Sequence, residues 1–395
     1  MITVEEAKRH IQTTHRDFGL EEVVLDRAIG RVLREDWFCD RDLPPYDRVT
    51  MDGIAVAFDE VDFSNPITIE GLAKAGDPQH RIQHGTNCLE VMTGAVLPLG
   101  VDTVIRYEDL HIDNNKATVS TEVSKAQNVH FKGLDRKSGD LLVKSGTMIS
   151  SAEIGIGASI GQVQTKVARL PRVIVISTGD ELVEIDESPA PHQIRRGNVY
   201  RIKSSLSNRG IVAHTDHIVD DLEETKRRIS QHLQSYDVLI LSGGVSKGKL
   251  DYVPEALRSC GVRQIFHKIS QRPGKPMWFG AVDQGPVVFG LPGNPVSSFM
   301  CYQVYFLHWL ELCLGYKRKP TMVKLRHEVA FKPDLTYFLE VSISSGDDGT
   351  IYALPQKGNG SGDFANLTRA DGFIELKKGR NLYEAGEVYP FLPYR

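Results

Sequence analysis

The sequence is poor in cysteine and in long apolar segments, and each shortage excludes a class of protein. Its five cysteines among 395 residues lie far apart and form no Cys-x-x-Cys pair, so we interpret them as reduced core residues. No apolar run approaches the roughly 20 residues needed to cross a bilayer, and the first residues lack the basic and apolar regions of a signal peptide. A formal net charge of −4 provides no basic surface for nucleic acid or membrane. We therefore expect a cytoplasmic protein that binds neither.

Several catalytic motifs are also missing. There is no His-Glu-x-x-His pair, no Walker A loop and no Gly-x-Ser-x-Gly turn, which argues against zinc metalloproteases, P-loop NTPases and α/β hydrolases. The composition is that of a globular protein, with 41% hydrophobic and 25% charged residues. The length suits two to four domains.

The hydrophobic pattern changes several times along the chain. Helical spacing follows a capping box of Thr3 and Glu6, and short β-type runs occupy residues 53–123. Between residues 171 and 315 apolar strands alternate with amphipathic helices, which predicts a doubly wound, mostly parallel sheet. After residue 320 the pattern returns to short strands and predicts a small barrel or sandwich. We therefore expect a multidomain α/β protein with additional β domains.

Glycine-rich turns follow the apolar strands of the predicted parallel sheet. SGGVSKG lies at residues 242–248, RPGKP at 272–276 and GLPGNP at 290–295. Glycine lets the backbone approach an anion, and a following helix N-terminus offers free N–H groups. Because ligands bind at the carboxyl ends of parallel strands, these neighbouring turns predict one phosphate-bearing ligand held by several loops.

Cations and carboxylates accompany these turns. Lys268, Arg272 and Lys275 surround a proline-fixed turn, which suits an anion better than a flexible charge run does. Asp220 and Asp251 lie at the end of a predicted strand and at the start of a predicted helix. Each is either a helix cap or a ligand of Mg²⁺, which favours a few carboxylates together with ligand oxygens. Both interpretations stay open.

A further polar turn, STGDEL at residues 177–182, follows the first strand of the predicted sheet. Its hydroxyls and carboxylates would lie at the same edge as the glycine-rich turns. Arg195 and Arg196 would add positive charge there. The alternatives are a helix-capping turn and a solvated basic loop.

Three polar side chains lie in glycine-containing segments at a distance from these turns in the sequence. They are Asp52 in MDG (51–53), Thr93 in MTGA (92–95) and Asp135 in GLD (133–135). Each segment is an ordinary turn signal, so the residues alone favour a structural role.

Taken together, these segments resemble the molybdopterin molybdenumtransferases, the bacterial MoeA family related to the C-terminal domain of gephyrin. Each matching stretch is weak evidence alone, but all occur in the family's order and span nearly the whole chain. They are LPPYD (43–47), MDGIAV (51–56), MTGA (92–95), STGDEL (177–182), SGGVS (242–246), PGKP (273–276) and GLPGNPVS (290–297).

The resemblance implies that molybdate replaces the adenylyl group of adenylylated molybdopterin in a Mg²⁺-dependent reaction that releases AMP and molybdenum cofactor. It implies an elongated homodimer with the active site between subunits, and a molybdopterin adenylyltransferase as a candidate partner. It also implies four domains, two of them discontinuous. Domain I would comprise residues 1–20, 39–47 and 136–170, and the mostly β domain II would comprise residues 21–38 and 48–135. The molybdopterin-binding domain III would comprise residues 171–318, and the C-terminal β-barrel domain IV would comprise residues 319–395.

The family pattern also implies roles for individual residues. The expected catalytic residues are Asp52, Thr93, Glu181, Asp251, Lys268 and Lys275. The expected pterin-binding residues are Asp135, Ser177, Thr178, Gly179, Gly243, Gly244, Ser246, Arg272, Pro292, Asn294, Pro295 and Ser361. Glu181, Asp220 and Asp251 would serve the metal, and Asp52 and Thr93 would reach the cleft from the partner subunit.

The sequence departs from the family pattern at Arg48, Lys247, Arg272 and Glu340, which bears on the choice between molybdate and tungstate. Two other functions fit parts of the sequence. The α/β domain alone also resembles molybdopterin adenylyltransferases, although the N-terminal β domain favours metal insertion. A non-catalytic scaffold like gephyrin would be favoured by a partner-binding extension, which the sequence does not show.

Overall fold

The chain divides into two compact units in the computed structural model, which describes residues 1–245 and 251–395. Unit 1 comprises Met1–Arg34, Gly146–Ser150 and Gln164–Arg395, and unit 2 comprises Glu35–Ser145 and Ser151–Val163. This division is coarser than the four domains expected from the sequence, whose boundaries stay a prediction.

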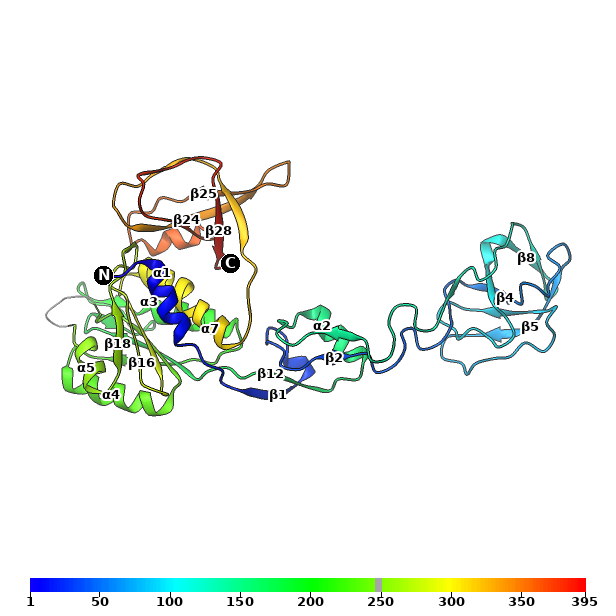
Figure 1. Ribbon diagram of the computed structural model, residues 1–395, viewed down its shortest axis with the longest axis horizontal. Coiled ribbons are helices and arrows are strands. Elements are labelled where there is room, and N and C mark those ends of the chain that lie inside the picture. Colours follow the sequence, from blue (N-terminus) through cyan, green and yellow to red (C-terminus); the bar gives the residue numbers. More distant parts are fainter. Residues whose placement is uncertain (246–250) are drawn as a thin grey trace. The chain divides into compact units, whose positions relative to one another are not determined.

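A six-stranded sheet forms the centre of unit 1 (Figure 1). Its first four strands run parallel, whereas the fifth is antiparallel to both of its neighbours. A doubly wound, mostly parallel sheet is therefore confirmed. In spatial order the strands are β16 (His214–Ile218), β13 (Val173–Thr178), β17 (Val238–Ser242), β21 (Val287–Leu291), β20 (Trp278–Ala281) and β18 (Arg263–His267).

Helices cover both faces of this sheet because successive strand side chains point to opposite sides and both sides are apolar. One face packs against α4 and α5. The other packs against α1, α3 and a continuous helical segment made of α6, the π-helical turn η3 and α7 (Figure 1). The helices are α1 (Val4–Thr13), α3 (Gly197–Ser207), α4 (Leu222–Ser235), α5 (Val253–Ser259), α6 (Pro295–Cys301), η3 (Tyr302–Phe306) and α7 (Leu307–Cys313).

The first helix begins at the capping box expected from the sequence. Glu6 N donates to Thr3 Oγ1 at 3.1 Å, and Thr3 N donates to Glu6 Oε2 at 2.7 Å. The apolar face of α1, made of Val4, Ala7 and Ile11, is fully buried in the core beneath the sheet. Although the sequence suggests that residues 1–20 belong to domain I, this buried face packs α1 against the α/β sheet. The next strand, β1 (Leu20–Val24), pairs antiparallel with β12 (Gln164–Ala168).

A closed five-stranded barrel lies at the C-terminal end of unit 1, which confirms the predicted barrel. Each barrel strand pairs with two others around the ring. A short strand, β19 (Gln271–Arg272), joins it in parallel with β24, so a loop of the α/β domain is fixed to the barrel. The barrel strands are β22 (Thr321–Leu325), β24 (Thr336–Ser345), β25 (Ile351–Pro355), β26 (Gly372–Leu376) and β28 (Val388–Pro393).

Unit 2 is mostly β, as the sequence predicts. Its six-stranded sheet has two apolar cores, and the unit also contains the α-helix α2 (Ser151–Ser159) and a 3-10 turn at Tyr107–Asp109. Short ladders pair β2 (Trp37–Phe38) with β11 (Leu141–Val143) and β3 (Arg48–Val49) with β10 (Val129–His130). In spatial order the sheet strands are β7 (Thr103–Arg106), β4 (Gly53–Val56), β6 (Cys88–Val91), β5 (Ile67–Ala73), β9 (Lys116–Val119) and β8 (Leu110–Asp113). Within the described ranges of both units, no helix is long and apolar enough to span a bilayer.

Candidate functional site

A large pocket opens in unit 1 where the parallel strands β13, β17 and β21 end. It has a volume of about 1780 Å³, and Gly244, Lys275 and Asn294 all line it, so the three glycine-rich turns meet in one place as predicted. Loops of the C-terminal barrel complete its wall. The expected site residues in this wall are Ser177, Thr178, Gly179, Glu181, Asp220, Gly243, Gly244, Asp251, Arg272, Lys275, Pro292, Asn294, Pro295 and Ser361.

The glycines after β17 are required by both conformation and space. Gly243 and Gly244 have φ angles of 104° and 65°, in the left-handed region that side chains disfavour. A Cβ atom on Gly244 would lie only 2.7 Å from Thr178 Oγ1 and from Val253 Cγ2. Glycine therefore lets this turn lie tightly against the end of β13, and its backbone forms part of the pocket floor.

The turn after β21 is held by amide side chains. Asn198 Nδ2, near the start of α3, donates to Gly293 O at 2.7 Å and to Ser242 Oγ at 3.0 Å. Asn294 Nδ2 donates to Ser361 Oγ at 2.8 Å. These bonds connect the ends of two strands with a loop of the barrel, so the pocket wall is tied together on several sides.

A buried glutamine supports the turn at residues 272–276, which we call the cationic turn because it carries Arg272 and Lys275. Gln271 is fully buried, and its Nε2 donates to Gly274 O at 3.1 Å while its Oε1 accepts a hydrogen bond from Tyr305 Oη in the π-helical turn. Arg272 and Lys275 are exposed and line the pocket. A rigid turn therefore presents two cations to the pocket, which is the charge that a phosphate or another oxyanion needs.

Carboxylates also line this pocket. Asp220 N donates to Asp180 Oδ1 at 3.0 Å. Burial raises the pKa of Asp220, and the negative charges of Asp180 and Asp251 raise it further. A cation near these groups would be stabilised by their charge. Among the residues that the structure describes, no three His, Cys, Asp or Glu side chains form a metal site by themselves.

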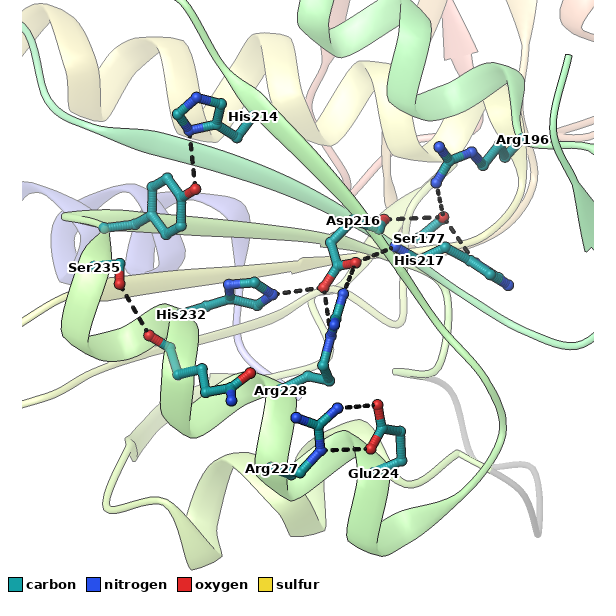
Figure 2. Close-up of polar contacts among 12 residues, drawn as sticks. Ser177, Arg196, His214, Asp216, His217, Glu224, Arg227, Arg228, His232 and Ser235 are labelled. Carbon is teal, nitrogen blue, oxygen red and sulfur yellow. Dashed lines mark hydrogen bonds and ion pairs between the residues drawn. The ribbon is translucent and has the colours of Figure 1, made fainter.

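A polar network supports the end of β13 behind the pocket wall. Figure 2 shows Ser177 Oγ between Arg196 Nη1, at 3.5 Å, and His217 Nδ1, at 3.1 Å. Arg196 also pairs with Glu184, to which its Nε donates at 2.9 Å. The Ser177 hydroxyl is thus fixed where β13 enters the pocket.

Two polar atoms in the pocket wall have no hydrogen-bond partner within the described part of the chain. They are Thr178 Oγ1 and Glu340 Oε1, both shielded from solvent. Burial also raises the pKa of Glu340. Unsatisfied buried polar atoms are costly, so a bound ligand that pairs with them would gain affinity.

Some lining residues were not among those expected from the sequence. The barrel contributes Tyr337 and Phe338 on β24, and the glycine-rich loop at residues 358–362, of which only Ser361 was expected. The sequence GNGSG of that loop was a usable signal, whereas nothing local marks Tyr337 as a pocket residue. Arg201, on α3, also lines the pocket.

Other expected site residues are not among those that line the pocket. Lys268, with a φ of 75°, is not part of the pocket wall, and Ser246 is outside the described residues. Asp52 and Thr93 belong to unit 2, where Asp52 Oδ1 accepts hydrogen bonds from Thr93 N at 2.6 Å and Thr93 Oγ1 at 2.7 Å. These bonds lower the pKa of Asp52. Asp135 in unit 2 lies 3.0 Å from His130 Nε2.

Three family models match consecutive parts of the chain. They are the MoeA N-terminal region with domains I and II, at residues 2–161, a domain described as probable molybdopterin binding, at 174–311, and the MoeA C-terminal region, domain IV, at 322–394. A molybdopterin molybdenumtransferase of Synechocystis is 40% identical over 99% of both chains. The chain belongs to the MoeA family of molybdopterin molybdenumtransferases.

More distant members agree in sequence and in fold. A molybdopterin molybdenumtransferase of Staphylococcus epidermidis is 28% identical over 98% of this chain and 94% of its own. The crystal structure of a molybdopterin biosynthesis MoeA protein from Pyrococcus horikosii superposes with a TM-score of 0.82, at 28% identity, over 100% of this chain and 99% of its own. The MoeA likeness therefore extends across both units.

Proposed function

We propose that this MoeA family member is a transferase of molybdenum cofactor biosynthesis that inserts molybdate into adenylylated molybdopterin and releases AMP. The observation that carries the proposal is the meeting of Gly244, Lys275 and Asn294 in one large pocket of a chain whose curated relatives are named molybdopterin molybdenumtransferases. Both reactants are anions, so a site that joins them must first offset their repulsion.

The glycine-rich turns and the cationic side chains would both bind the anionic reactants. The backbone of Gly243 and Gly244 lies close enough to the pocket to accept a phosphate, and Arg272 and Lys275 supply positive charge from a rigid turn. The hydroxyls of Ser177 and Thr178 would orient oxygen atoms of the same ligand. Phosphate-bearing pterin and molybdate, both substrates, would thereby be held in one place while water is displaced.

Mg²⁺ is proposed as the cofactor, with Asp220, Asp251 and Glu181 as the residues that would hold it. The raised pKa of Asp220, which reflects burial and neighbouring carboxylates, fits a site that a cation would stabilise. Since the described side chains form no complete metal site, substrate oxygens would supply the remaining ligands, which is how Mg²⁺ usually binds. When bound, the ion would neutralise charge on the phosphates.

The homodimer and the partner-subunit role of Asp52 and Thr93 are part of the same proposal. The hydrogen bonds from Thr93 lower the pKa of Asp52 and orient its carboxylate, which suits a group that contacts substrate or metal. Asp135, Lys268 and Ser246 stay predicted site residues. A molybdopterin adenylyltransferase, whose product would be the substrate here, is the proposed partner.

The alternative of an adenylyltransferase is less well supported. The family likeness covers the N-terminal region as well as the molybdopterin-binding domain, and the curated relatives of full length are named for molybdenum transfer. The scaffold alternative has no observation in its favour.

An assay of AMP release from adenylylated molybdopterin, with and without molybdate, tests the proposal. We expect AMP release to require molybdate, and Glu181→Ala and Asp251→Ala to abolish it while circular dichroism shows a folded protein. Adenylylated pterin formed from molybdopterin, ATP and Mg²⁺ without molybdate would instead identify an adenylyltransferase. Full activity of both variants would show that the carboxylates of this pocket do not serve the reaction.

A further inference from the structure

A second cavity in unit 1, of about 390 Å³, is surrounded by arginines. We name it the arginine pocket and define it by Arg201 on α3, Arg209 just after that helix, Arg318 after α7, Arg395, and the neutral side chains Ser205 and Gln303. Arg201 also lines the large pocket, so the two cavities are neighbours.

The positive charge of the arginine pocket is only partly balanced. Arg318 pairs with Glu311 at 2.7 Å. Within the described part of the chain, the other three arginines form no ion pair with a carboxylate, although the charge of Glu311 also acts on Arg209. Burial lowers the pKa of Arg201, as expected for a cation whose charge is poorly compensated.

Neutral acceptors hold these arginines in place without neutralising them. Arg209 Nη1 donates to Ser205 O at 2.9 Å and to Ser205 Oγ at 3.1 Å. Arg395 Nη2 donates to Thr368 O at 2.9 Å, and Arg201 Nη1 donates to Asn198 Oδ1 at 3.2 Å. A guanidinium has five N–H donors in a rigid fork, so each of these groups keeps donors for a ligand.

A buried amide points to the same kind of ligand. Gln303, on the π-helical turn, is only 8% exposed and lines the arginine pocket. Its amide forms no hydrogen bond with the residues that the structure describes. Since no described residue occupies its N–H groups, Gln303 adds a neutral donor to the charged donors of the pocket.

One wall of the arginine pocket is apolar. Phe299 and Tyr394 pack edge to face, with ring centroids 5.2 Å apart, and Arg201 lies over the Phe299 ring at 5.7 Å. The cavity volume falls within the range of about 300–1,000 Å³ that is common for small-ligand sites. It therefore has room for an oxyanion and for a small group attached to it.

We propose that the arginine pocket is a second anion site, which binds a tetrahedral dianion, either free or as the phosphate of a small monoester. Forked guanidinium groups match the oxygen geometry of such an anion, and the anion would relieve the repulsion among the arginines. The site does not depend on the reaction proposed for the large pocket, because none of its residues except Arg201 lies there.

Titration calorimetry of the full chain with inorganic phosphate, molybdate and AMP tests this site. Comparing the free oxyanions with AMP shows whether the site binds a free dianion or the phosphate of a monoester. We expect Gln303→Glu, which places a carboxylate of the same shape among the arginines, to remove one of the oxyanion sites that the wild type shows. Arg209→Gln should weaken the second site about tenfold or more, because a hydrogen bond to a charged group is lost. Arg27→Gln, an exposed arginine outside the pocket, is the matched control.

Crystals soaked in molybdate locate the site directly through the anomalous signal of molybdenum. A peak between Arg209 and Gln303 in the wild type, absent in Gln303→Glu, would support the proposal. Oxyanion binding that Gln303→Glu leaves unchanged, or a wild-type crystal with no peak in the arginine pocket, would overturn it. Thermal unfolding of each variant shows whether it is folded, and Arg209→Gln serves if Gln303→Glu is not.

Discussion

At the scale of single residues, Asp216 shows how a partly buried carboxylate stays ionised next to the pocket wall. Burial opposes its ionisation, but hydrogen bonds from His232, Arg228 and the backbone of His217 outweigh it and lower its pKa to about 2 (Figure 2). The carboxylate thereby joins α4 to β16, and the ring of His217 holds Ser177 in the pocket wall.

Replacing this carboxylate should destabilise the fold in a pH-dependent way. We expect Asp216→Asn to lower the free energy of unfolding by about 2 kcal/mol at neutral pH, because Arg228 loses its counter-charge and the hydrogen bond to His232 is weakened. The folded pKa of about 2 lies below the unfolded value of about 3.9. The wild type therefore loses this stabilisation, and the difference between the proteins shrinks, as pH falls from about 4 to about 2.

Urea unfolding at pH 7 and at low pH measures both effects. Glu223→Gln is the matched control, since the Glu223 side chain is 80% exposed and its pair with Lys226 should contribute less than about 1 kcal/mol. Equal unfolding midpoints for wild type and Asp216→Asn at pH 7 would rule out this role of the carboxylate.

Residues within recognisable turns were the ones that the sequence could place. Lys275 and Asn294 are in turns with a strong local pattern, and both line the pocket. Glu340 and Tyr337 come from a barrel strand, where the alternating pattern says which side is buried but not which side meets another domain. Their place in the pocket depends on how the barrel packs on the α/β sheet, and that packing is a long-range property.

At the scale of elements, the cationic turn and the helical segment behind it form one packed assembly. Gly274 has a φ of 84°, and a Cβ atom there would lie 2.5 Å from Cys301 Sγ and 2.9 Å from Met300 Cε. The π-helical turn places Tyr305 where its hydroxyl reaches Gln271 beneath the same turn. Such turns are frequent at functional sites, and here it supports the pocket.

Two glycine-to-alanine substitutions test this packing. Gly274→Ala should lower the free energy of unfolding by about 2 kcal/mol, because the new methyl group meets packed atoms and the backbone conformation is strained. Gly293→Ala, also in the pocket wall, should have a much smaller effect, because its nearest neighbour would be Gly243 Cα at an ordinary 3.7 Å. Thermal or urea unfolding compares the two. A Gly274→Ala protein as stable as Gly293→Ala would contradict the packing described.

Elements with a strong hydrophobic pattern could be predicted from the sequence, and elements with a weak pattern could not. The apolar strands β13, β17 and β21 and the amphipathic α4 form part of the strand–helix alternation predicted for residues 171–315. The antiparallel pair β20 and β18 was not, because β20 has only four residues and β18 has no regular alternation of buried and exposed side chains. The π-helical turn within the apolar helical segment also carries no sequence signal that distinguishes it from an α-helix.

At the scale of the whole molecule, the proposed homodimer makes a prediction about mixed subunits. If Asp52 acts in the active site of the partner subunit, Asp52→Ala and Lys275→Ala homodimers are both inactive. A heterodimer of the two then carries one intact site. Random mixing should restore roughly a quarter of the wild-type rate of AMP release, since half of the dimers are mixed and each has one working site.

Native mass spectrometry of the mixture shows whether heterodimers have formed. Heterodimers that stay inactive would place Asp52 in the same subunit's site, an active Asp52→Ala homodimer would place it outside the reaction, and a monomeric wild type would remove the homodimer from the proposal. A mixture of Lys275→Ala with Lys275→Ala/Asp52→Ala provides a control with no intact site.

The crystal structure of this protein with adenylylated molybdopterin tests the central claim most directly. We predict that the phosphates of the ligand lie against Gly243 and Gly244, within hydrogen-bond distance of Lys275 and near Asn294. Phosphate density at any other part of the molecule, with the large pocket filled by solvent, would contradict the account.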